Sequence, residues 1–72
     1  MKKAVRIVGW NVGLAKLPLV VYLRENFGVT DGNSRLHLLL REKKPICLTV
    51  AEGDVEAVVK DLEAFGAVVE VN

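Results

Sequence analysis

The chain has 72 residues, of which 51% are apolar and 26% charged, and its net charge is +1. This composition argues against intrinsic disorder, because disordered chains have few branched apolar residues and a high net charge. A single cysteine excludes an intrachain disulfide framework and a thiolate zinc site, so we expect no metal and no cofactor. The longest apolar run, from Leu17 to Leu23, is too short for a membrane helix of roughly 20 residues.

The first half of the chain predicts a strand followed by two helices. Residues 4–10 are rich in Val and Ile and predict a strand in which Val5 and Ile7 share one face. Residues 16–27 predict a helix that begins near residues 15–17, with Pro18 in its first turn, and ends at a left-handed glycine, Gly28. The expected buried stripe of this helix consists of Leu17, Val20, Val21 and Phe27, with Arg24 interrupting it.

The middle of the chain predicts a second helix and a second strand. The helix is expected over residues 33–43, with its N-terminal cap at Thr30 or Asp31 and its end at Pro45. Its expected buried stripe is Leu36, Leu39 and Leu40. The strand over residues 46–50 alternates Ile46, Leu48 and Val50 with Cys47 and Thr49, and we expect Cys47 to be buried and inert within the sheet.

The last part of the chain predicts the clearest helix, followed by a third strand over residues 67–71. The apolar residues of this helix recur at helical spacing: Val55, Val58, Val59, Leu62 and Phe65. The predicted order is thus strand, helix, helix, strand, helix, strand. The economical arrangement is a two-layer α+β domain over residues 1–72, with a three-stranded sheet and three helices on one of its faces.

Charge is distributed unevenly along the chain. Residues 1–50 carry nine Lys or Arg and three acidic residues, a net +6, whereas residues 51–72 carry one Lys and six acidic residues, a net −5. Such asymmetry predicts a basic face on one part of the fold. An ordinary solvated surface, an acidic protein partner and a nucleic acid all remain compatible with it.

Little in the sequence supports catalysis. A nucleophilic Cys47 would need the only histidine, His37, beside it as a base. The carboxylates at 52, 56 and 63 are typical of a solvated helix face. We therefore expect a protein that is not an enzyme. With no signal peptide after Lys2 and Lys3, we expect it in the cytoplasm and away from membranes.

Local preferences are broken on the first two helices. Lys16 places a cation at a helix N-terminus, where the helix dipole disfavours it. Arg24 interrupts an apolar stripe, and Leu38 points away from the other leucines of the second helix. Such violations collect at functional sites, although tolerated surface residues would explain them too.

A phrase near the end of the chain resembles a known family. The third helix ends in Leu-Glu-Ala-Phe-Gly-Ala, residues 62–67, and the strand continues through Val-Glu-Val, residues 69–71. This resembles the C-terminal domain of the bacterial ribosomal stalk protein of the large subunit, in which a Leu-Glu-x-x-Gly-Ala ending runs into a Val-Glu-Val strand. The resemblance is close over residues 51–71 and covers the rest of the chain in element order.

The resemblance implies a protein-binding site on the first two helices. In that family these helices bind translational GTPases through a basic and apolar patch. Lys16 falls on the family's lysine at the start of the first helix, and Leu17 and Val20 on its apolar contacts. Arg24 falls on its arginine one turn later, and Arg35 on a lysine early in the second helix. The implied partner is an acidic protein such as a translational GTPase.

The sequence also departs from this family. Val21 and Gly32 stand where the family has further lysines, so the patch is less basic and more apolar. The family's N-terminal dimerisation region and hinge have no counterpart here, so we expect a stand-alone relative. Nothing in the pattern sets an oligomeric state.

Two alternatives remain. A nucleic-acid-binding module would use the basic residues of the N-terminal half, namely Lys2, Lys3, Arg41, Lys43 and Lys44, although few aromatic residues are available to stack on bases. The chain is also faintly similar to the N-degron adaptor of the Clp protease. That adaptor has an acidic loop before its first helix, whereas residues 12–15 carry no acid here. We favour the hypothesis of a protein-binding module over the nucleic-acid-binding module and the N-degron adaptor.

Overall fold

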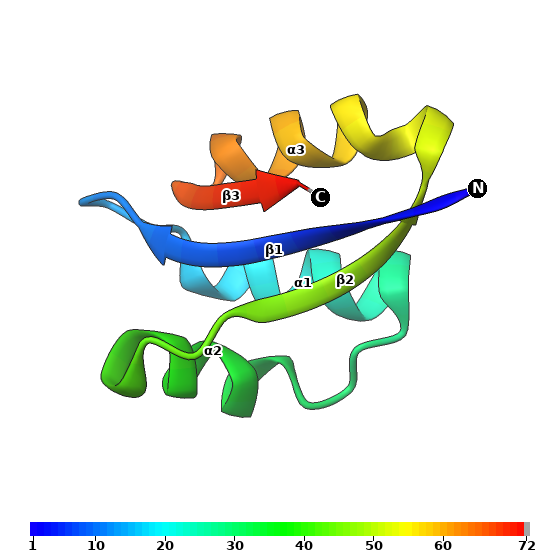
Figure 1. Ribbon diagram of the computed structural model, residues 1–72. Coiled ribbons are helices and arrows are strands. Elements are labelled where there is room, and N and C mark those ends of the chain that lie inside the picture. The colour runs from blue at the N-terminus through cyan, green and yellow to red at the C-terminus, as the bar shows by residue number, and fades with distance from the viewer. Residues whose placement is uncertain (72) are drawn as a thin grey trace.

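The computed structural model describes residues 1–71 and confirms the expected α+β class and element order. Figure 1 shows a three-stranded sheet with α1 behind it and α2 and α3 beside it. The elements are β1 (Lys2–Trp10), α1 (Lys16–Phe27), α2 (Gly32–Glu42), β2 (Ile46–Ala51), a 3₁₀ turn η1 (Glu52–Asp54), α3 (Val55–Ala64) and β3 (Ala67–Val71). No helix within residues 1–71 is long and apolar enough to span a bilayer.

The sheet has the order β2-β1-β3, with β1 antiparallel to both neighbours (Figure 1). Val5 pairs with Leu48 on one side and with Val71 on the other. Because both outer strands oppose β1, they run parallel to each other. The register between β1 and β3 shifts between Ile7 and Gly9, where an irregularity interrupts the pairing.

One face of the sheet carries the whole core. Every second residue of β2 is buried, as alternation in a half-covered strand predicts. The core joins strand residues of one face to two residues from each helix: Val5, Ile7, Ile46, Leu48, Val50 and Ala67 with Leu19, Leu23, Leu36, Leu39, Val58 and Leu62. All three helices therefore cover the same face of the sheet, as the sequence predicts.

The predicted buried stripe of α1 is wrong. Leu19 and Leu23 are its fully buried residues, whereas Leu17 is 70% exposed. Val20, Val21 and Phe27 are only half-buried. The error arises because α1 is apolar almost all round between residues 17 and 23, so more than one stripe fits the spacing.

Cys47 is exposed, which corrects the expectation that it is buried. Since Ile46, Leu48 and Val50 take the face covered by helices, alternation turns Cys47 to the uncovered face. Its neighbour across the pair is Arg6, whose Nη2 lies 3.5 Å from Oε2 of Glu70 on β3. The uncovered face thus carries polar and small residues together with the exposed Val68, and it holds no part of the buried core.

Helix α2 begins after Asp31 and ends before Lys43. Asp31 occupies the N-cap position, but its carboxylate makes no capping bond and instead accepts a hydrogen bond from Arg35. The helix ends one residue earlier than expected, because Lys43 adopts a left-handed conformation with φ 56°. Gly28 closes α1 in the same conformation, with φ 67°, as predicted.

Candidate functional site

Helix α1 carries four of the five predicted site residues. Lys16, Leu17 and Arg24 are exposed, and Val20 is half-buried. The helix buries Leu19 and Leu23, which lie four residues apart on one side. Residues 17, 20 and 24 follow one another at spacings of three and four, so they share the neighbouring flank. The structure therefore places an apolar flank with a cation at each end on one side of α1.

Arg35 belongs to α2, whose first residue packs against α1. A Cβ on Gly32 would lie 3.2 Å from Cγ1 of Val20, which shows how closely the start of α2 approaches the side chain of Val20. This contact explains why Val20 is half-buried. Arg35 follows Gly32 by about one turn and is exposed, with Nε donating to Oδ1 of Asp31 at 2.9 Å.

The cations of the candidate site differ in their pairing. Arg35 forms a salt bridge with Asp31, which reduces the positive charge that Arg35 offers to a ligand. Within residues 1–71, no carboxylate forms an ion pair with Lys16 or Arg24. Lys16 and Arg24 are therefore the positive charges of this surface that remain available to an acidic partner.

An open, mostly apolar groove of about 480 Å³ adjoins Leu17. It is formed by the side of α1 and by Phe65 at the end of α3. Its lining residues are Leu17, Pro18, Val21, Tyr22, Glu25, Asn26 and Phe65. The groove extends the candidate site toward α3. The family resemblance did not imply this part of the surface, because the resemblance places the contacts on the first two helices alone.

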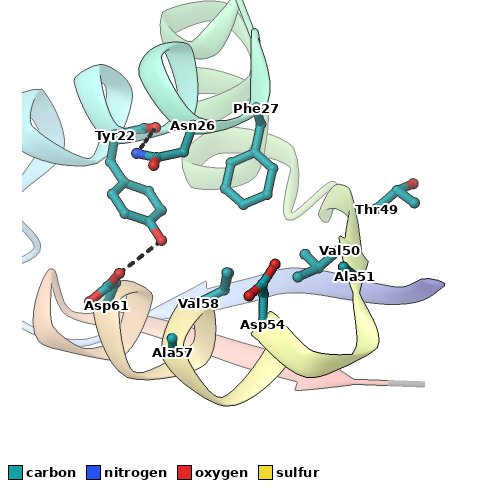
Figure 2. Close-up of a pocket in the computed structure, with 10 residues that line it drawn as sticks. All are labelled: Tyr22, Asn26, Phe27, Thr49, Val50, Ala51, Asp54, Ala57, Val58 and Asp61. Carbon is teal, nitrogen blue, oxygen red and sulfur yellow. Dashed lines mark hydrogen bonds between the residues drawn. The ribbon is translucent and has the colours of Figure 1, made fainter. Parts of the chain in front are cut away.

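A second, more polar pocket of about 370 Å³ lies between the end of α1, β2 and α3. Figure 2 shows Tyr22 and Asn26 from α1 facing Asp61 on α3, with Phe27 beside them. Tyr22 donates its hydroxyl hydrogen to Oδ2 of Asp61 at 3.0 Å, and Asn26 donates to the backbone oxygen of Tyr22 at 3.0 Å. Sequence reasoning missed this pocket, because its members lie in two helices and a strand that are distant in sequence.

The environment of Tyr22 changes its acidity. Burial of its ring raises the pKa of Tyr22 from 10.0 to about 12, and the hydrogen bond to Asp61 and the negative charge of Asp61 act in the same direction. The ring also contacts Phe27 and Phe65, with centroids 6.0 and 5.4 Å away. A neutral Tyr22 therefore joins α1 to α3. At neutral pH the Tyr22 hydroxyl stays protonated and serves as the hydrogen-bond donor to Asp61.

The structure separates the residues of the nucleic-acid alternative. Lys2 pairs with Ala51 at one end of β2, whereas Lys43 and Lys44 precede Ile46 at the other end. At a rise of about 3.3 Å per residue, Lys2 and Lys44 are about 20 Å apart along the sheet. Lys44 also lies 3.8 Å from Glu42. Lys2 therefore lies at the opposite end of the sheet from Lys43 and Lys44.

The structure also separates Cys47 from His37. Cys47 lies on the uncovered face of the sheet, and His37 lies on α2, which covers the opposite face. Nε2 of His37 is 3.3 Å from Nη1 of Arg41. The sheet therefore separates the thiol of Cys47 from the imidazole of His37, which would have to act as its base. Within residues 1–71, no three His, Cys, Asp or Glu side chains are grouped as metal ligands.

No protein-family model, no curated protein and no solved structure matches this chain. The resemblance to the stalk domain therefore depends on residues 51–71 and on the order of the elements.

Proposed function

We propose that this chain is a non-enzymatic protein-binding module that receives an acidic, partly apolar protein segment on α1 and the start of α2. The binding surface consists of Lys16, Leu17, Val20, Arg24 and Arg35. The resemblance to the stalk C-terminal domain makes a translational GTPase the first partner to test.

The observation that carries this proposal is the exposure of Leu17. A leucine that is 70% exposed beside Lys16, on a helix that already buries Leu19 and Leu23, adds nothing to the core. Single exposed apolar residues are common on proteins, but Leu17 continues into the apolar groove lined by Pro18 and Phe65. Contiguous apolar surface of this kind is typical of an interaction site.

The charges around Leu17 define the chemistry of the partner. Lys16 and Arg24 flank the apolar surface and are not neutralised by a carboxylate within residues 1–71. Charges at the rim of an interface act mainly on the association rate and on the salt dependence of binding. The matching segment therefore presents apolar side chains to Leu17 and carboxylates to the two cations.

The test is a titration of the ¹⁵N-labelled chain with a purified translational GTPase, followed by amide chemical shifts. Leu17→Ala is expected to weaken binding about 10-fold, corresponding to about 1.4 kcal/mol. Arg24→Ala and Lys16→Ala are expected to slow association and to flatten its salt dependence without altering the fold. Val68→Ala on β3 and Lys60→Ala on α3 are matched controls that should leave binding unchanged.

The proposal fails if the shifts of a bound partner cluster on α3 or on the uncovered face of the sheet while Lys16 and Arg24 stay silent. Equal losses for Leu17→Ala and Val68→Ala would also contradict it, because Val68 is exposed, at 40%, but lies on the uncovered face of the sheet.

A further inference from the structure

Strand β3 is an edge of the sheet with an open outer side. In the order β2-β1-β3 it pairs with β1 alone, so alternate residues direct their N–H and C=O groups away from the sheet. Within residues 1–71 no backbone hydrogen bond from a loop or turn reaches residues 67–71 on that side. Such an edge is a template for a further strand.

The two edges of the sheet are protected differently. Natural sheets blunt their edges with lysine and proline. Residues 43–45, Lys-Lys-Pro, lead directly into β2, whereas neither β2 nor β3 contains lysine or proline within the strand itself. The β3 edge differs from the β2 edge because it lacks such flanking residues and borders an apolar depression beside Val71.

An apolar depression of about 500 Å³ lies beside the end of β3. Val71 forms one wall, and Val55 and Val59 of α3 form the other, with Glu56 and Lys60 at the rim. Val71 is 45% exposed although it lies on the face covered by helices, as its pairing with buried Val5 requires. A strand that paired with β3 would turn every second side chain toward this depression.

The charged residues on this side of α3 determine which kind of ligand can bind beside β3. Glu63 follows Glu56 by seven residues, so both glutamates lie on the same side of α3. Within residues 1–71 neither glutamate forms an ion pair, and Lys60 offers the only positive charge on this side of α3. Two copies meeting here would bring four glutamates together against two lysines, which disfavours a symmetric dimer through this edge.

We propose that β3 and the adjoining surface of α3 bind an extended protein segment of alternating basic and apolar residues by strand addition. Main-chain hydrogen bonds to β3 supply affinity, and the depression beside Val71 selects apolar side chains. Glu56 and Glu63 attract the basic residues. This surface is separate from that of Leu17 and Arg24, and its ligand carries the opposite charge.

The test uses the peptide acetyl-Lys-Val-Lys-Val-Lys-Val-Lys-amide, with the same peptide bearing Glu in place of Lys as the control. Amide shifts and hydrogen exchange of the ¹⁵N-labelled chain are followed at low salt. The lysine peptide is expected to shift β3 and the first two turns of α3 and to slow exchange at outward-facing amides of β3. The glutamate peptide is expected not to bind.

Val71→Lys and Val68→Lys form a matched pair on the same strand. Val68 is 40% exposed but lies on the uncovered face, away from the depression. Val71→Lys is expected to weaken peptide binding by about 10-fold or more, and Val68→Lys by less than about 2-fold. The double variant E56Q/E63Q, which leaves the strand untouched, is expected to lose most of the salt dependence.

Three results would overturn the proposal. The first is equal binding of the peptide to wild type and to E56Q/E63Q at all salt concentrations. The second is shifts confined to α1, α2 or the uncovered face, or no shift at millimolar peptide. The third is a concentration-dependent dimer in sedimentation that Val71→Lys dissociates, because a second copy would then occupy the edge. The first and third results do not bear on binding at Leu17, so the two proposals can fail separately.

Discussion

Helices α1 and α3 are both rich in branched apolar residues, but they use them differently. In α3 the apolar residues recur at helical spacing, and Val58 and Leu62 from this set are buried. In α1 they surround the helix, so that burial of Leu19 and Leu23 leaves Leu17 in solvent. A helix whose apolar residues recur at helical spacing buries them in the core. A helix that is apolar on all sides leaves some of its apolar side chains exposed, where they can contact another molecule.

The largest expected effect tests which side of each helix supports the fold. Leu23→Ala and Leu62→Ala each remove a fully buried side chain and should lower the free energy of unfolding by about 2–5 kcal/mol. Leu17→Ala should change it by less than about 0.5 kcal/mol. Urea denaturation of the three variants measures this. If Leu17→Ala lowered the free energy of unfolding as much as Leu23→Ala, Leu17 would belong to the core and α1 would not differ from α3 in this way.

Helices α1 and α3 both end at a glycine, but the surroundings of the two glycines differ. Gly28 after α1 and Gly66 after α3 both have positive φ, but an added Cβ meets nothing within 4 Å at Gly28. At Gly66 it would lie 3.1 Å from the backbone Cα of Leu14. Gly28→Ala should therefore cost about 1 kcal/mol and Gly66→Ala up to about 3 kcal/mol.

Thermal unfolding of the two glycine variants gives the measurement. The loop that approaches Gly66 is fixed by hydrogen bonds from Asn11 to Gly66 O and from Ala15 to Phe65 O, at 2.7 and 2.8 Å. Since this backbone has little freedom to move aside, equal losses for the two variants would show that the loop yields.

The smallest effect concerns the hydrogen bond that joins the two helices. Tyr22→Phe removes the hydroxyl that donates to Asp61 and should cost about 0.5–1.5 kcal/mol at neutral pH. The folded-state pKa of Tyr22, at about 12, is raised above the ordinary value of 10.0. The contribution of neutral Tyr22 is therefore complete below pH 10 and is lost as pH rises toward 12, because the unfolded chain ionises first.

Tyr22 is the only tyrosine, so ultraviolet absorbance of the native chain reports its ionisation directly. We expect a midpoint near pH 12 for the wild type and a lower midpoint for Asp61→Asn, which removes the negative charge. Tyr22→Phe should remove this component from the pH dependence of stability. A wild-type midpoint near pH 10 would mean that α1 and α3 are not joined in this way.

Most of the fold was predictable because strong local signals agree along the chain. Turn glycines, Pro18 and Pro45, and the alternation of Ile46, Leu48 and Val50 all specify the same elements. The burial of α1 was not predictable, since periodicity cannot choose among several apolar sides of one helix. The exposure of Cys47 was misjudged for a different reason: alternation gives it the opposite face from Leu48, and only the arrangement of the helices decides which face is covered.

The candidate site was predictable in part. The exposure of Lys16 and Arg24 agrees with their odd positions in the helix pattern, and their role in binding stays a prediction. The groove at Phe65, the Tyr22–Asp61 contact and the open edge of β3 depend on contacts between elements that are distant in sequence. No local pattern encodes such contacts, so they required the tertiary arrangement.

The central position of β1 also determines when the sheet can form during synthesis of the chain. Of the three strands, β1 is synthesised first and its second partner, β3, is synthesised last, and the register joins Val5 to Val71. The sheet therefore cannot be completed during translation until residues 67–71 have left the ribosome. Until then one side of β1 lacks its partner strand, and closing so long a loop makes β3 docking a slow step compared with the folding of a helix.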